Sequence, residues 1–328
     1  MREYKYNYVI CGSIVSYFDL MYRDLKELEN VRYFSSFWEG SNNRISYYLK
    51  RATFSEKINK FIKLPFSRYT FPRIYPFHFN DDKPICFVFF ETSAYMINTS
   101  YMEYLSLRYP NSKKVLYMQD LVSKNPFLNL ERAKKVMDLI ISYDKGDCER
   151  YNFLYSPTPM SKFSISENDT PFSDVYFCGL IKSQKRYDNI MSVYNLCKSK
   201  GLKCLFYLVG VPVELQKNTD GIIYNKKLSY IENLKHVDHT KCILEVMQED
   251  ADGYTLRLWE SFLLQKHLLT NNKCLKISKY KELKNIHYTD FDLNSILDWI
   301  YNPVEIEKEI INSISPISLL KTIDNELI

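Results

Sequence analysis

The sequence predicts an α/β protein with two doubly wound, parallel-sheet domains that face a cleft. Strand-like apolar runs alternate with helical stretches along most of the chain, which is the pattern of parallel βα units. The alternation stops at residues 156–173, which are rich in Ser, Pro, Thr, Asn and Asp, and then restarts. The 328 residues are enough for two cores. We therefore expect an N-terminal domain over 1–160 and a C-terminal domain over 170–328.

Each half supplies its own series of strands. The run at 84–90 is apolar throughout, as expected for a strand buried on both faces. The strands expected in the first half are 6–11, 31–37, 84–90, 114–118 and 139–142. Those expected in the second half are 174–179, 204–209, 221–224, 242–247 and 266–270. In sheets of this kind ligands bind beyond the carboxyl ends of the strands.

Helical stretches connect these strands. The spacing of apolar residues predicts helices at 16–28, 100–108, 128–137, 186–200 and 230–237, and another after Thr255. The tail, 293–327, is expected to form helices interrupted at Pro303 and Pro316. We assign these C-terminal helices to the second domain.

Composition favours a folded cytoplasmic protein. Hydrophobic residues make up 46% of the chain and charged residues 25%, which excludes a disordered protein. The eight cysteines include no Cys-x-x-Cys, so we expect buried reduced thiols rather than disulfides or a zinc site. The N-terminal residues show no signal-peptide pattern, and no stretch has the length of a membrane span.

The segment from 44 to 73 is basic and aromatic. It has eight Lys and Arg against one acid, Glu56, with seven Tyr and Phe interleaved. Such a segment suits an anionic surface at the inner face of the cell membrane, or a lipid-linked pyrophosphate. A solvated helix face followed by a loop explains it equally well. No nucleic-acid-binding motif accompanies it, so no nucleic acid partner is expected.

A carboxylate in an apolar helix marks a candidate site near the C-terminus. Glu260 lies between Trp259 and Phe262, where an ionised group is costly unless something hydrogen-bonds it. A ligand is one candidate partner, and an ion pair with Arg257 is another. The helix begins near Thr255, where backbone N–H groups suit the phosphates of a nucleotide diphosphate. An ordinary N-cap is the structural alternative for Thr255.

Over 174–272 the chain resembles the nucleotide-sugar glycosyltransferases of the GT-B fold, especially bacterial enzymes of capsule, exopolysaccharide and lipopolysaccharide assembly. The acidic segment carries much of the resemblance, since Asp252 and Glu260 match the family pattern Glu-x7-Glu with Asp in the first place. The resemblance implies that Glu260 holds the ribose of the donor and that Asp252 contacts the sugar or shapes the turn. It also implies an acceptor-binding first domain and a donor-binding second domain.

A strand end and a basic stretch add to the resemblance. Gly179 closes the strand 174–179, and Lys185 and Arg186 follow it before a helix. The resemblance implies that these residues contribute to the donor site and that one of the two cations reaches the donor phosphates. It implies no cofactor and no bound metal, the nucleotide sugar being a co-substrate. His236 and His239 have no third partner in the sequence that would make a metal site.

The general base is expected in the first domain. Asp120 and Glu91 each follow an apolar strand directly and should point beyond the carboxyl end of the sheet. Asp120 is the first choice and Glu91 the second, and a helix cap is the alternative for each. The leading hypothesis is transfer of a sugar to a hydroxyl of a lipid-linked glycan in surface polysaccharide synthesis. A non-catalytic GT-B-like partner subunit and a nucleotide-sugar epimerase are the alternatives. A dehydrogenase is disfavoured because no Gly-x-Gly-x-x-Gly follows a strand.

Overall fold

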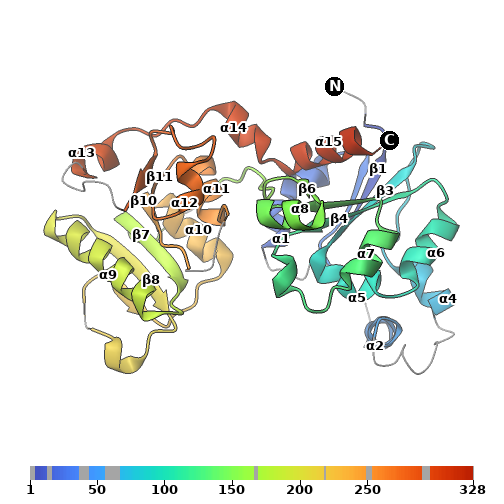
Figure 1. Cartoon of the computed structure of the whole chain (residues 1–328), viewed down its shortest axis with the longest axis horizontal. Helices are drawn as coiled ribbons and strands as arrows, with labels where there is room; N and C mark the ends of the chain where they lie inside the picture. Colours follow the sequence, from blue (N-terminus) through green and yellow to red (C-terminus); the bar gives the residue numbers. More distant parts are fainter. Residues whose placement is uncertain are drawn as a thin grey trace. The chain divides into compact units, whose positions relative to one another are not determined.

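Two six-stranded parallel sheets organise the computed structural model (Figure 1). They belong to two compact units: the first unit comprises Met1–Ser161 with Ile314–Ile328, and the second comprises Lys162–Ser313. The structure describes residues 4–12, 17–36, 44–55, 67–165, 169–217, 219–248, 253–289 and 296–327. The predicted fold class, with two doubly wound parallel sheets, is confirmed.

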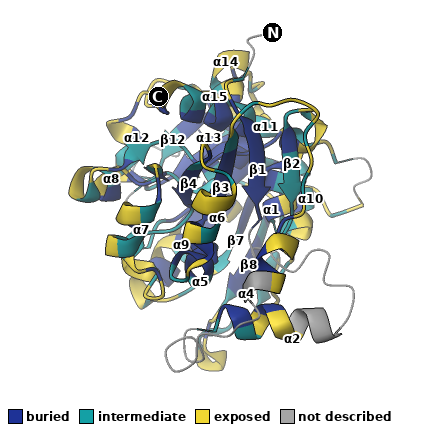
Figure 2. Cartoon of the chain, turned by 90° about the vertical axis from the view of Figure 1, so that its right-hand side faces the viewer, coloured by how far each residue is buried: buried dark blue, intermediate teal, exposed yellow. Residues whose placement is uncertain are grey.

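The first sheet has the strand order β2-β1-β3-β4-β5-β6, and all of its pairs are parallel. Its strands are β1 (Asn7–Cys11), β2 (Val31–Phe34), β3 (Ile85–Phe90), β4 (Lys113–Met118), β5 (Leu139–Ser142) and β6 (Leu154–Tyr155). The central strands β3 and β4 are buried almost throughout because helices cover both faces of the sheet. Figure 2 shows these strands as buried and the outer sides of α6 and α7 as exposed.

The second sheet has the order β12-β11-β10-β7-β8-β9 and is also parallel throughout. Its strands are β7 (Ser173–Leu180), β8 (Cys204–Val209), β9 (Ile222–Tyr224), β10 (Thr240–Glu245), β11 (His267–Thr270) and β12 (Ile286–Tyr288). Because β11, β10 and β7 are parallel neighbours in this order, their carboxyl ends lie side by side at the same end of the sheet. Residues after these three strands can therefore meet.

Helices of the first unit are mostly short. They are α1 (Phe18–Met21), α2 (Arg44–Thr53), α4 (Ser67–Thr70), α5 (Ala94–Ile97), α6 (Tyr101–Arg108), α7 (Leu130–Val136), α8 (Lys145–Tyr151) and α15 (Pro316–Glu326). Single 3-10 turns are η1 (Arg23–Glu27), η2 (Phe71–Arg73), η3 (Glu91–Ser93) and η4 (Val122–Lys124). The prediction of one helix over 16–28 is wrong, since α1 ends at Met21 and a 3-10 turn follows.

Helices of the second unit begin at recognisable caps. Ser183 caps α9 (Gln184–Ser199), Ser229 and Glu232 form a capping box on α10 (Tyr230–Asp238), and Thr255 caps α11 (Leu256–Leu263). The other elements are η5 (Val213–Leu215), α12 (Lys273–Lys276), α13 (Ile296–Tyr301) and α14 (Lys308–Ser313).

The last helix, α15, belongs to the first unit and not, as was predicted from the sequence, to the second domain. The tail was expected to complete the second domain over 170–328, but α15 lies in the first unit. The hydroxyl of Tyr8 in β1 donates to the backbone oxygen of Leu320 at 3.2 Å and to Asp324 at 2.5 Å. Leu320 and Ile323 are completely buried, so the apolar face of α15 finishes the first core.

Candidate functional site

A fully buried carboxylate stands at the end of β10 in the second unit. Glu245 accepts hydrogen bonds from the hydroxyls of Thr255 and Thr270, at the ends of neighbouring elements. Thr255 also caps α11, accepting from the backbone N–H of Arg257 at 3.2 Å. Glu245 was not among the site residues predicted from the sequence. An acid in the last position of an apolar strand was the signal that would have found it.

Arg257 lies in the first turn of α11, where a cation is unfavourable for the helix dipole. Its Nη2 donates to the backbone oxygen of Cys178 at 2.5 Å. Its guanidinium carbon lies 5.6 Å from the ring centre of Phe177. The carbonyl of Cys178 and the ring of Phe177 therefore hold this side chain in place.

Arg186, in the first turn of α9, approaches the same ring. Its guanidinium carbon lies 6.0 Å from the ring centre of Phe177, and the side chain is only 5% exposed. Nη1 donates to the backbone oxygen of Leu180 at 2.8 Å, but the buried Nε has no hydrogen-bond partner among the described residues. The pKa of Arg186 is lowered to about 10, mainly by burial and also by Arg257, while Glu245 opposes the shift.

We call Arg186, Arg257, Phe177, Glu245 and Thr255 the arginine cluster. It brings together two of the predicted donor-site residues, Arg186 and Thr255. The other predicted cation, Lys185, has an exposed side chain.

Gly179, predicted to serve the donor, makes room for this cluster. A β-carbon at this position would lie 2.9 Å from Cζ of Phe177 and 3.3 Å from Nη2 of Arg257. The contacts that require a glycine here therefore come from the protein's own side chains. Asp252 lies outside the described residues.

Glu260 borders the arginine cluster but is turned toward α10. It is 3% exposed, and burial raises the pKa of its carboxyl. Arg257 opposes that shift most, and the side chains of Tyr230 and Asn233 in α10 oppose it as well. A ligand and Arg257 were the partners expected from the sequence, and Arg257 and two side chains of α10 are the groups that favour the charged form of Glu260. Contact of Glu260 with a ribose stays a prediction.

Glu91 and Asp120 lie close together in the first unit, as expected for the ends of the adjacent strands β3 and β4. Glu91 is 5% exposed, and its Oε2 accepts from the backbone N–H of Gln119 at 2.7 Å. The pKa of Glu91 is raised to about 7, mainly by burial and to a smaller extent by Asp120. Hydrogen bonds from the backbone N–H groups of Gln119 and of Glu91 itself oppose the shift. The carboxyl of Glu91 therefore titrates near neutral pH.

Asp120 has a different environment. Its side chain is 49% exposed, lies 3.5 Å from Nζ of Lys124, and accepts from the backbone N–H of Leu121 at 2.8 Å. This is the capping alternative of the sequence analysis. Tyr17 and Tyr143 lie near both carboxyls, and burial raises the pKa of each phenol. Protein groups thus surround Glu91, whereas Asp120 is ion-paired at the surface.

No three His, Cys, Asp or Glu side chains gather as metal ligands in the described ranges. Within the same part of the chain, no helix is long and apolar enough to cross a membrane.

Comparison with known structures bears on the fold. The UDP-GlcNAc 2-epimerase from Methanocaldococcus jannaschii is similar with a TM-score of 0.50 and 10% identity, covering 96% of this chain and 98% of that one. The fold is GT-B-like. The glycotransferase of kitacinnamycin is similar with a TM-score of 0.46 and 8% identity, covering 98% of this chain and 100% of that one. No protein-family model and no curated protein matches the sequence.

Proposed function

We propose that the second unit binds the diphosphate of a nucleotide sugar between Arg186 and Arg257. The observation that carries this proposal is the pair of guanidinium groups beside Phe177, one of them with a buried, unpartnered Nε. Two like charges at one place disfavour each other, and a bound anion removes that penalty. Glu245 opposes the lowering of the Arg186 pKa, whereas burial favours the neutral form of Glu260.

The helix geometry supports the same ligand. Arg186 and Arg257 both stand in the first turns of their helices, where free N–H groups and the dipole favour a negative charge. Thr255 is fixed by Glu245 and lies beside Arg257. Two fixed guanidiniums and two helix N-termini match a diphosphate better than a single carboxylate.

We infer that the reaction is glycosyl transfer. The acceptor hydroxyl gives its proton to a carboxylate as its oxygen bonds to the anomeric carbon of the sugar. The bond from that carbon to the diphosphate breaks, and the electron pair leaves with the diphosphate oxygen, whose charge the two arginines stabilise. Glu91 is the preferred base in this proposal because a carboxyl with a pKa of about 7 can both accept and release a proton near neutral pH. A glycan of bacterial surface polysaccharide synthesis is the proposed acceptor, on the sequence resemblance.

Donor binding tests the proposal. The chain is titrated with UDP-, GDP-, CMP- and TDP-sugars while the unfolding temperature is followed, since a bound donor stabilises the fold by mass action. We expect one nucleotide class to raise the unfolding temperature. Arg186→Met should weaken that nucleotide more than tenfold, because a charge-assisted bidentate contact is lost. The matched control is Lys185→Met. Lys185 directly precedes Arg186 and has an exposed side chain, so this change should alter the affinity less than threefold.

The unfolding temperature of the ligand-free variant separates binding from folding. Arg186→Met removes a buried charge that lacks a full set of partners, so the ligand-free protein should be as stable as the wild type or more stable. A large loss of stability without ligand, or unchanged nucleotide affinity, would show that Arg186 is structural. Product analysis with the bound donor then separates transfer from its alternatives. Hydrolysis or transfer supports a transferase, a changed sugar without acceptor indicates an epimerase, and binding without turnover indicates a non-catalytic subunit.

A further inference from the structure

Two short helices of the first unit form one element that the proposed reaction does not use. Phe54, next to the end of α2, and Phe71, at the start of η2 after α4, stack with ring centres 5.9 Å apart. Both rings are buried. The hydroxyls of Thr53 and Thr70 lie 3.3 Å apart beside them. The described parts of 44–55 and 67–73 are therefore fixed to each other as one surface element, which we call the α2–α4 element.

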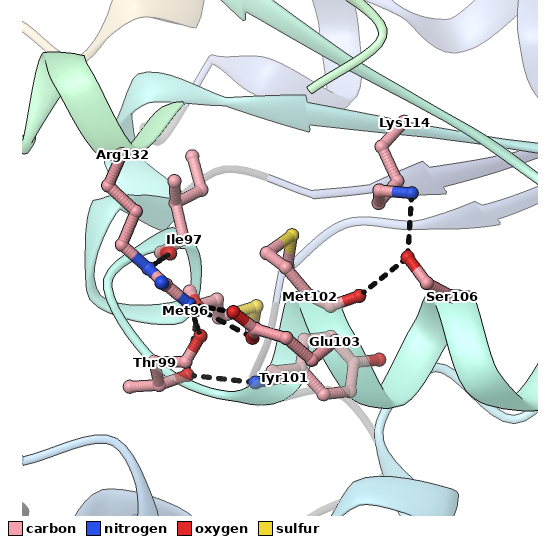
Figure 3. Close-up of polar contacts among 9 residues, drawn as sticks. All are labelled: Met96, Ile97, Thr99, Tyr101, Met102, Glu103, Ser106, Lys114 and Arg132. Atoms are coloured by element: carbon pink, nitrogen blue, oxygen red, sulfur yellow. Dashed lines mark hydrogen bonds and ion pairs between the residues drawn. The ribbon is translucent and has the colours of Figure 1, made fainter. Parts of the chain in front are cut away.

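The α2–α4 element is seated on a rigid support. The rings of Phe54 and Phe71 lie 5.8 and 5.2 Å from that of Tyr101, the first residue of α6. Figure 3 shows how Arg132 of α7 holds the turn before this helix. Arg132 donates to the backbone oxygens of Ile97 and Thr99 and to both carboxylate oxygens of Glu103 at 2.8 and 2.9 Å.

The outward side of this element combines aromatic, aliphatic and cationic groups. Tyr48 is 61% exposed, Leu49 40% and Tyr69 64%, and the side chains of Arg51 and Arg73 are exposed as well. Figure 2 shows exposed parts of α2 and α4 at the surface. The described residues of 44–55 and 67–79 include no acid that would neutralise the two arginines.

The opposite side of the α2–α4 element is buried, so its two sides have different surroundings. Lys50 is buried with Thr53 and Phe54, and burial lowers the pKa of its ammonium group. Tyr48 and Arg51, three residues apart, share the other side of α2. Basic residues of this segment are thus not all solvated alike, and those that face outward lie beside exposed tyrosines.

We propose that the α2–α4 element docks the protein on an anionic lipid bilayer. Tyrosine places an apolar ring at the acyl boundary and a hydroxyl among the headgroups, and arginine pairs with lipid phosphate. Leu49 gains from transfer to the acyl boundary, whereas it would gain nothing from a nucleic acid backbone. The charge complementarity is to phosphate-bearing lipid, and each arginine should contribute roughly a fivefold gain in partitioning. This docking is independent of whether the chain transfers sugar.

Vesicle sedimentation tests the docking. The full chain is mixed with vesicles of phosphatidylcholine, with or without 30% phosphatidylglycerol, at low and at high salt. We expect retention by the anionic vesicles at low salt, release at high salt, and little retention by neutral vesicles. The double variant Arg51→Gln/Arg73→Gln should bind at least tenfold more weakly. Tyr48→Ser/Tyr69→Ser should also bind more weakly, although its charge is unchanged.

Matched controls come from exposed residues of the second unit. Lys217→Gln/Lys279→Gln removes the same charge, and Val213→Ser removes an exposed apolar side chain, and both should bind like the wild type. Circular dichroism checks that every variant is folded. No retention by anionic vesicles, or equal retention of the α2–α4 variants and the controls, would overturn the proposal. Equal competition by duplex DNA, with the tyrosine variant unaffected, would instead indicate a polyanion site and would also overturn it.

Discussion

At the scale of single residues, two carboxyls with the same sequence context have different environments. Glu91 and Asp120 each follow an apolar strand, so the sequence could place both at the carboxyl end of one sheet. It ranked Asp120 first and could not show that Glu91 is the buried one, because the burial of Glu91 and its hydrogen bond from the backbone N–H of Gln119 come from other parts of the chain. The partners of Glu260 were hidden for the same reason, since two of them come from α10.

The raised pKa of Glu91 predicts a pH-dependent stability. Its carboxyl has a pKa of about 7 in the fold against 4.5 in the unfolded chain, so the folded protein binds more protons between these values. The free energy of unfolding should therefore fall as pH rises through this window, by roughly 3 kcal/mol from this group. Glu91→Gln should remove most of that fall. Urea unfolding at pH 5 and pH 8 measures it.

Asp120→Asn is the control for this prediction. The side chain of Asp120 is half exposed, so its removal should leave the pH dependence of stability almost unchanged. An identical pH dependence in Glu91→Gln and the wild type would contradict the assigned environment of Glu91.

At the scale of elements, the strands with long apolar runs were predictable from the sequence, whereas several short strands and helices were not. β3 and β4 are each six residues of mostly apolar sequence, β10 contains the apolar run 242–244, and all three lie near where they were expected. β6 and β12 were missed because two or three residues carry no periodicity, and each is defined by a neighbouring strand. The prediction of one helix over 16–28 was wrong because an amphipathic pattern does not distinguish an α-helix from a 3-10 turn.

The Arg132 contacts predict a large effect from one surface-lying side chain. Arg132→Met should lower the free energy of unfolding by about 2 kcal/mol, because the backbone oxygens of Ile97 and Thr99 lose a charged donor. Glu103→Gln keeps those two contacts and should cost only about 0.5 kcal/mol. Urea denaturation compares the two variants. Equal losses would mean that the ion pair, not the carbonyl contacts, holds this turn.

At the scale of the whole molecule, the return of α15 to the first unit is the feature that the sequence could not predict. An amphipathic helix shows which of its sides is apolar, but not which of two sheets that side covers. The connection is local and specific: the backbone N–H of Met160 donates to the backbone oxygen of Ile314 at 2.7 Å. The chain therefore passes between the units twice, at 161–162 and at 313–314.

Hydrogen exchange can test which core α15 completes. Leu320→Ala removes a fully buried side chain and should cost about 3 kcal/mol. Exchange should become faster in β1 and η1 and stay unchanged in β7 to β12. Ile300→Ala, in α13 of the second unit, is the matched control and should affect the second sheet instead. Faster exchange in the second sheet of Leu320→Ala would contradict the division.

The position of α15 also has a consequence for synthesis. The first sheet leaves the ribosome early, but the helix that covers Tyr8 follows only after roughly 150 further residues of the second unit. At ordinary translation rates this delay is about 8 to 30 s. During that time the nascent first unit exposes the apolar surface that Leu320 and Ile323 later cover. A chaperone that recognises apolar surface should therefore hold the growing chain longest at this face.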